Sequence, residues 1–258
     1  KWSENNQIKL SIDNKAIKNV DEKKLLFEVV HKSKDNIDDT FLIELKPDKK
    51  IKFTSGDLLS IIPKNETKNR LYSIAKIDKN ILLSVKKHEL GVCSNYLNSL
   101  KIKDKISASI KKNENFHFPK KPKEIILIAN GTGIAPFLGM IQKNRKKQEL
   151  HLFWGGRTKE SFNIYQRLIN KSLNNKQLTS FYSVFSQEQK EKKYVQDILK
   201  NHTALISNTL KNGNIIMICG SLSMQKGVEK VISKITKSEL EVSLDRYKKN
   251  HQIKVDCY

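Results

Sequence analysis

Apolar residues in the first half of the chain occur in short runs, some of them alternating with polar residues. Asp, Asn, Lys, Gly and Pro separate these runs, a pattern typical of β-strands joined by turns. The predicted strands are 25–30, 41–45, 58–62, 71–75 and 81–85. Helical spacing occurs only after Asn95, at Tyr96, Leu97 and Leu100. Several short strands with one helix predict an antiparallel β-barrel.

The second half has a different period. Segment 124–129 is a nearly continuous apolar strand, and a glycine turn and a helix over 134–142 follow it. The pattern predicts further strands at 151–154, 181–185 and 215–219, with helices at 194–210 and 222–235. Strands that alternate with helices indicate a parallel sheet with crossover connections. We therefore expect a barrel domain over 1–119 and a doubly wound parallel-sheet domain over 120–258, joined through the Lys-rich segment 111–122.

Composition agrees with two domains and restricts the partners. The chain has 258 residues and a net charge of +22, from 49 Lys and Arg against 27 Asp and Glu. Such charge favours a polyanionic partner, either nucleic acid or an acidic protein. Because the lysines are spread along the whole chain, we attribute most of the charge to a general abundance of Lys. No recognised nucleic-acid motif is present, so we expect no nucleic-acid partner.

Two further features bear on location and metal content. No apolar stretch approaches the roughly twenty residues of a membrane-spanning helix, and the chain begins at Lys1, as expected of a mature or trimmed form whose targeting peptide is gone. Cys93, Cys219 and Cys257 are an odd set without metal-ligand spacing. We therefore expect no metal site and a reducing compartment.

Two short motifs in the first half predict a flavin site. Arg70-Leu71-Tyr72-Ser73 offers a guanidinium for phosphate, a phenol ring for a flat heterocycle and a hydroxyl beside that ring. Gly91-Val92-Cys93-Ser94-Asn95 is a glycine turn entering a helix, whose backbone N–H groups can hold a pyrophosphate. Together they describe a site for a molecule with an aromatic tricycle and a diphosphate, which is a flavin dinucleotide.

The second half has motifs of a nucleotide site. Asn130-Gly131-Thr132-Gly133 lies between a strand and a helix, where backbone can approach a diphosphate, although Pro136 replaces the third glycine of the usual fingerprint. Cys219-Gly220 ends another strand at the same sheet edge, and its thiol suits either contact with a nicotinamide ring or burial in the core. The loop 186–189 lies where an adenosine end is expected, and Ser186, Tyr194 and nearby lysines are its candidate contacts.

The order of these motifs resembles plant-type ferredoxin-NADP⁺ reductase over essentially the whole chain. The matching strings are R-L-Y-S, G-V-C-S-N-Y-L, G-T-G-I-A-P-F, the S-x-E-Q loop followed by Y-V-Q, C-G-S-L-S-M and V-D-C-Y. The resemblance implies an FAD-binding barrel followed by an NADP(H)-binding α/β domain. It also implies electron transfer between NADPH and ferredoxin, an acidic iron-sulfur protein, in a plastid such as an apicoplast.

The resemblance assigns roles by position. Ser73, Cys219, Asp256 and Tyr258 would be catalytic, with Ser73 near the flavin N5, Cys219 facing nicotinamide C4 and Tyr258 covering one flavin face. The residues that would hold FAD are Arg70, Leu71, Tyr72, Ser73, Gly91, Val92, Cys93, Ser94, Thr132 and Tyr258. Those that would hold NADP are Lys86, Thr132, Gly133, Ser186, Tyr194, Gln196, Cys219 and Gly220.

Three positions depart from the family pattern. Gln187 stands where an arginine usually binds the 2′-phosphate, and Asp256 stands where the family has Glu. The segment before Gly91 lacks the tyrosine that stacks on the FAD adenine, and His88 is the only ring there. Alternatives to the ferredoxin enzyme are a related flavin reductase serving cytochrome b5 or flavodoxin and, from another class, a basic nucleic-acid-binding protein.

Overall fold

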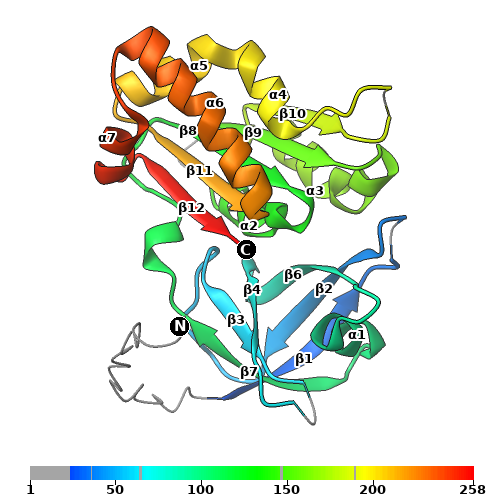
Figure 1. The fold of residues 1–258 in the computed structure, drawn as a ribbon. Coiled ribbons are helices and arrows are strands. Elements are labelled where there is room, and N and C mark those ends of the chain that lie inside the picture. Colours follow the sequence, from blue (N-terminus) through cyan, green and yellow to red (C-terminus); the bar gives the residue numbers. More distant parts are fainter. Residues whose placement is uncertain (1–23, 36, 64–65, 146–147, 189) are drawn as a thin grey trace, which may run out of the picture.

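The computed structural model describes residues 24–35, 37–63, 66–145, 148–188 and 190–258, and it contains two sheets (Figure 1). Gln189 of the predicted loop lies outside the described residues. The first sheet is antiparallel and has the strand order β4-β3-β7-β1-β2-β6-β5. Its strands are β1 Leu25–Lys32, β2 Thr40–Pro47, β3 Leu58–Ile61, β4 Arg70–Ser73, β5 Ala75–Ile77, β6 Asn80–Lys86 and β7 Lys105–Lys111.

The two edge strands of this sheet, β4 and β5, are consecutive in the chain and only Ile74 separates them. The sheet must therefore curl until its edges meet, which gives a nearly closed barrel. Ile74 donates its N–H to Asp57 O at 3.0 Å and accepts from Gly56 N–H at 3.0 Å. The barrel fold was predicted correctly, but the predicted strand 71–75 is two strands, because the backbone changes partners at Ile74.

The second sheet is parallel and has the order β10-β9-β8-β11-β12. If these five strands are numbered 1 to 5 in chain order, their order across the sheet is 3-2-1-4-5. The direction of winding therefore reverses between β8 and β11. Its strands are β8 Glu124–Asn130, β9 Glu149–Gly156, β10 Ser180–Phe185, β11 Ile215–Gly220 and β12 Ile253–Cys257. The α-helices among the described residues are α1 Val92–Ser99, α2 Ala135–Gln142, α3 Asn163–Asn174, α4 Val195–Leu199, α5 Thr203–Lys211, α6 Leu222–Leu240 and α7 Leu244–Lys249.

Alternate residues of β8 face opposite sides of the parallel sheet. Ile125, Leu127 and Ala129 pack with α2 and α3, whereas Ile126 and Ile128 pack with α4 to α7. Figure 1 shows helices on both faces. This confirms the predicted doubly wound architecture. Strands β7 and β12 and helix α3 were not predicted, and the predicted helix 194–210 is interrupted at 200–202 by a 3-10 turn.

The two sheets share an apolar cluster. Leu42, Ala75 and Leu82 of the barrel belong to the same buried cluster as Phe137 and Met140 of α2. Because this shared cluster is buried and close-packed interiors resist movement, it favours a fixed relative placement of the barrel and the parallel sheet. The predicted domain boundary between residues 119 and 120 falls in the segment that joins β7 to β8. Among the described residues, no helix combines the length and apolar character needed to cross a membrane.

Gly133 tests how tightly the glycine turn packs on the sheet. A Cβ at this position would lie 2.3 Å from Cys219 O, a backbone atom that cannot move away easily. We expect Gly133→Ala to lower the free energy of unfolding by about 2–3 kcal/mol, the upper part of the usual cost of overpacking. Gly155→Ala is the matched control, since its Cβ would meet Val195 Cβ at an ordinary 3.4 Å. Denaturant titration measures both, and equal losses would contradict the packing argument.

Candidate active site

A cavity of about 600 Å³ lies at the carboxyl ends of the parallel strands, where the winding order reverses. Open α/β sheets bind their ligands at this position. The strand ends contribute Asn130, the last residue of β8, with Gly131 after it, Gly155 and Gly156 at the end of β9, and Gly220 at the end of β11. Predicted site residues that line the cavity are Lys86, Thr132, Ser186, Tyr194, Gln196, Gly220 and Tyr258.

Gly220 shapes this edge through its backbone. Its φ of +145° lies in a region that side chains rarely allow, and an added Cβ would lie 2.1 Å from Asn130 Oδ1. Asn130 in turn accepts the Ser221 N–H at 2.9 Å, which joins the ends of β8 and β11. Gly220 is therefore required for the two strand ends to meet.

Three of the four predicted catalytic residues meet where β4 of the barrel faces β11 and β12. Ser73 Oγ donates a hydrogen bond of 2.6 Å to Asp256 Oδ2. Burial raises the pKa of Asp256, and the hydrogen bonds from Ser73 and the Asn113 side chain oppose this shift. Burial, with the nearby Asp256 charge, also raises the pKa of the Cys219 thiol well above its ordinary value. Cys219 is therefore a neutral thiol.

Tyr258, the fourth, is ordered by hydrogen bonds at the cavity. Its hydroxyl lies 3.0 Å from Thr132 Oγ1, its N–H donates to Gly220 O at 3.0 Å, and its carbonyl accepts from Leu222 N–H at 3.2 Å. Tyr258 is nevertheless 63% exposed, whereas Cys219 is 0% exposed. Cys219 is thus enclosed and does not line the cavity, so contact with a nicotinamide ring requires movement of its surroundings.

The two predicted flavin motifs are adjacent in space. The Tyr72 hydroxyl and the buried Cys93 thiol form a hydrogen bond, and burial raises the pKa of Tyr72. The Arg70 charge is close enough to lower the pKa of both groups, although burial raises that of Cys93 overall. Strand β4 and the start of α1 therefore lie side by side, as the predicted flavin site requires.

The start of α1 leaves room for a ligand to approach its backbone closely. An added Cβ at Gly91 would lie 2.5 Å from Ser94 Oγ. Ser94 Oγ donates to Gly91 O at 2.9 Å and accepts from His88 N–H at 3.2 Å, which fixes the turn. No side chain of the described residues caps the first N–H groups of α1. These donors, the Arg70 guanidinium and the half-buried Tyr72 ring fit a flavin dinucleotide.

The far end of the cavity has the predicted adenosine contacts. Ser186, Lys193 and Tyr194 line it together. The Oε1 atom of Gln196 is buried and has no hydrogen-bond partner among the described residues, so a ligand donor would satisfy it. Gly133, predicted to bind NADP, is instead packed beneath Cys219 O and does not line the cavity.

Arg157 was missed by the sequence analysis. It follows β9, lines the cavity with Ser186, and its Nη1 lies 3.8 Å from Asp38 Oδ1. The N–H of Gln187 donates to Arg157 O at 2.9 Å, so this arginine stands beside the position where the family arginine is absent. The available signal was the string Gly155-Gly156-Arg157 at the end of a buried strand. His88 also lines this cavity.

Comparison with known proteins agrees with this geometry. Residues 127–230 match the oxidoreductase NAD-binding domain family. The sulfite reductase [NADPH] flavoprotein alpha-component of Buchnera aphidicola is 33% identical over 226 residues, 79% of this chain and 37% of that protein. NADPH-dependent diflavin oxidoreductase 1 of Candida albicans is 36% identical over 142 residues, 53% of this chain and 24% of that protein. The chain thus spans well under half the length of these relatives.

Solved structures give the same answer for the fold. Ferredoxin-NADP⁺ reductase from Plasmodium falciparum aligns with a TM-score of 0.73 at 23% identity, covering 91% of this chain and 96% of that chain. Residues 127–230 in the second half of the protein thus resemble an oxidoreductase NAD-binding domain. The whole chain has the two-domain fold of ferredoxin-NADP⁺ reductase.

Asp256 gives a pH prediction. Because its folded-state pKa is raised above the ordinary 3.8, the folded protein binds the proton more tightly than the unfolded chain. This contribution is present in full at low pH and is lost as the pH rises from about 4 through the raised pKa. Asp256→Asn should remove the dependence, so the unfolding midpoint should fall less between about pH 4 and 7 than in the wild type. Asp245→Asn, on the exposed side of α7, is the control. Parallel wild-type and Asp256→Asn curves would contradict the assignment.

Proposed function

We propose that this protein is an FAD-dependent reductase of the plant type that moves electrons between NADPH and ferredoxin. The observation that carries the proposal is the meeting of Ser73 from the barrel with Asp256 from the parallel sheet, beside the enclosed Cys219 thiol. A cavity with nucleotide-binding character opens next to this meeting point. One domain thus supplies a flavin site and the other a nicotinamide site at a shared boundary.

The residues of β4 and α1 would hold the flavin. Arg70 and the N–H groups at the start of α1 would take the diphosphate, and Tyr72 would lie against the ring system. When bound, FAD supplies the link between hydride transfer and one-electron transfer. The protein contributes position: Ser73 is held by Asp256, and Asp256 is in turn contacted by Asn113.

The cavity would hold NADPH along its length. Ser186, Tyr194 and Arg157 would receive the adenosine end with its 2′-phosphate, and Thr132 and Gly220 would approach the pyrophosphate. The nicotinamide would reach Cys219 only after the Tyr258 ring moves. Productive hydride transfer needs reacting atoms about 3–3.5 Å apart. A nucleotide anchored at its adenosine end would hold its nicotinamide close to the Tyr258 ring, and would therefore displace that ring more readily than a nucleotide without the anchor.

The choice of ferredoxin follows from charge and chemistry. An iron-sulfur protein accepts one electron at a time, and an acidic partner complements a chain of net charge +22. The Plasmodium falciparum protein that shares this fold acts, by its name, on ferredoxin and NADP⁺. A plastid, such as an apicoplast, is the corresponding location. A second candidate is a flavodoxin-type carrier, favoured by the sulfite reductase flavoprotein and diflavin relatives.

Electron transfer at different salt concentrations tests the function. The purified protein should be yellow and should use NADPH to reduce both ferredoxin and a small neutral acceptor, such as a quinone. Because salt screens charges over a Debye length of about 10 Å at 0.1 M, the apparent affinity for ferredoxin should fall several-fold between low and moderate salt. Reduction of the neutral quinone should change much less, because the quinone carries no charge for salt to screen. Absence of flavin would reject the enzyme, whereas flavin-dependent reduction of flavodoxin alone would favour the second candidate.

Arg157 tests coenzyme choice. We expect Arg157→Ala to raise KM for NADPH about three- to tenfold and to leave KM for NADH nearly unchanged. Hydrogen bonds to charged groups contribute about 1.5–3 kcal/mol. We expect a smaller loss of binding free energy here, because the Arg157 side chain is half exposed and solvent screens its charge. Gln187→Arg should widen the preference for NADPH. Arg167→Ala, on the exposed face of α3, is the control. Equal effects of Arg157→Ala on both coenzymes would remove its assignment to the 2′-phosphate.

A further inference from the structure

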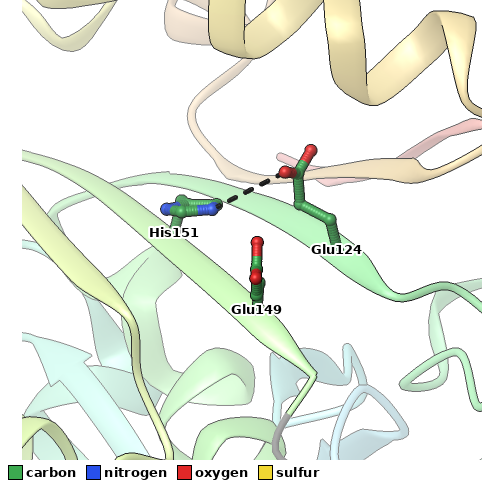
Figure 2. A group of neighbouring side chains, drawn as sticks. All are labelled: Glu124, Glu149 and His151. Carbon is green, nitrogen blue, oxygen red and sulfur yellow. Dashed lines mark ion pairs between the residues drawn. The ribbon is translucent and has the colours of Figure 1, made fainter.

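A cluster of Glu124, Glu149 and His151 lies at the opposite end of the parallel sheet from the cavity (Figure 2). Glu124 begins β8 and Glu149 begins β9, and the two are register partners. His151 follows Glu149 by two positions, so both side chains leave the same face of β9. Figure 2 shows the His151 ring beside the carboxyl groups of Glu124 and Glu149, and the three ligand atoms lie within 4.8 Å of one another.

The imidazole of His151 has one nitrogen without a partner. The residue is only 8% exposed, and Nε2 is buried without a hydrogen bond to any described residue. Its nearest charged neighbour, Glu124 Oε2, lies 3.9 Å away, too far for a hydrogen bond. A buried polar atom without a partner costs about 1–3 kcal/mol. An ion between Nε2 and the carboxylates would supply the missing interaction.

The surrounding hydrogen bonds orient two of these side chains. His151 Nδ1 lies 2.8 Å from Ser180 Oγ on β10, and Thr209 on α5 donates its hydroxyl to Glu124 Oε1. When Nδ1–H donates to Ser180, the lone pair of Nε2 points to the carboxylates. Metal-binding histidines have this arrangement, with the second nitrogen held by a polar group.

We propose that Glu124, Glu149 and His151 bind a divalent transition-metal ion, with Zn²⁺ as the best match. Zinc accepts histidine nitrogen and carboxylate oxygen at about 2.0–2.2 Å, and water completes its four ligands. Two carboxylates balance the charge of the ion. Magnesium and calcium prefer oxygen ligands alone, so the imidazole disfavours them.

The site is accessible and needs little rearrangement. Glu149 is exposed and free to turn toward the ion, and the Glu124 side chain is 19% exposed. A bound ion would join the starts of β8 and β9 and, through Thr209, the end of α5. The role is thus structural and separate from the proposed electron transfer. The cysteine spacing gave no sign of this site because none of its ligands is a cysteine.

Zinc titration of the FAD-loaded full chain tests the proposal. After dialysis against chelator, calorimetry with ZnCl₂ should show one high-affinity ion per chain, and the unfolding midpoint should rise with zinc concentration. Glu149→Gln should weaken binding at least tenfold without disturbing the fold, because the side chain is exposed. Ser180→Ala should weaken it about 10–100-fold, the usual effect of losing a group that orients a ligand.

Two control variants separate this site from adventitious binding. Glu66→Gln and His31→Ala change exposed residues of the barrel and should leave the titration unchanged. Magnesium and calcium should not compete at similar concentrations. The proposal is overturned if the wild type binds no zinc, in which case the cluster is a simple ion pair. It is also overturned if Glu149→Gln and Ser180→Ala bind zinc as tightly as the wild type, since the ion would then sit elsewhere, for example on a cysteine.

Discussion

The hydrogen bond between Ser73 and Asp256 joins residues 183 positions apart and crosses from one domain to the other. The proposed site exists only while this contact does, because neither domain alone brings Ser73 to Cys219. Its geometry demands that the barrel and the parallel sheet be held to within a fraction of an ångström. Fixed domain placement is therefore the constraint on which the rest of the structure depends.

A buried carboxylate helps to meet this constraint. Asp57 is 0% exposed, yet its pKa is lowered: burial opposes ionisation, but hydrogen bonds from Lys112, His117 and backbone N–H groups outweigh it. The Lys112 and His117 contacts measure 2.8 and 2.6 Å. Asp57 thus fixes the start of the segment between the domains, and Asn113 in that segment contacts Asp256. Well-paired buried charges of this kind cost much when one partner is lost.

The sequence predicted those features that local chemistry dictates. Strand β8, the glycine turn and strand β11 could be found because continuous apolar runs and paired glycines have few alternatives. Strand β7 has only three apolar residues, Ile106, Ala108 and Ile110, among serines and lysines, so its hydrophobic signal is weak. Strand β12 is half exposed, and the division at Ile74 depends on partners elsewhere in the barrel. These features are decided by tertiary contacts that no local pattern encodes.

The same distinction applies to the site. Arg70, Tyr72 and Ser186 carry recognisable chemistry within short motifs. Arg157 does not, because its relevance comes from the neighbouring loop that holds Gln187. The enclosure of Cys219 also depends on tertiary packing, since a cysteine at a strand end is compatible with both a surface and a core position. The proposed zinc ligands were not predicted from the sequence for a related reason. Glu124 lies far in sequence from His151, and only strand pairing brings them together.

Trp154 gives the cavity a spectroscopic property. Its indole N–H donates to Gly131 O at 3.0 Å, and its ring packs against Phe162, Tyr165 and Phe185 while lining the cavity. The only other tryptophan of the chain is Trp2. Replacing Trp2 would leave a protein whose tryptophan fluorescence comes from one indole, which is hydrogen-bonded to the glycine turn. Nucleotide entry and release would then be visible as emitted light, in real time and without an added dye.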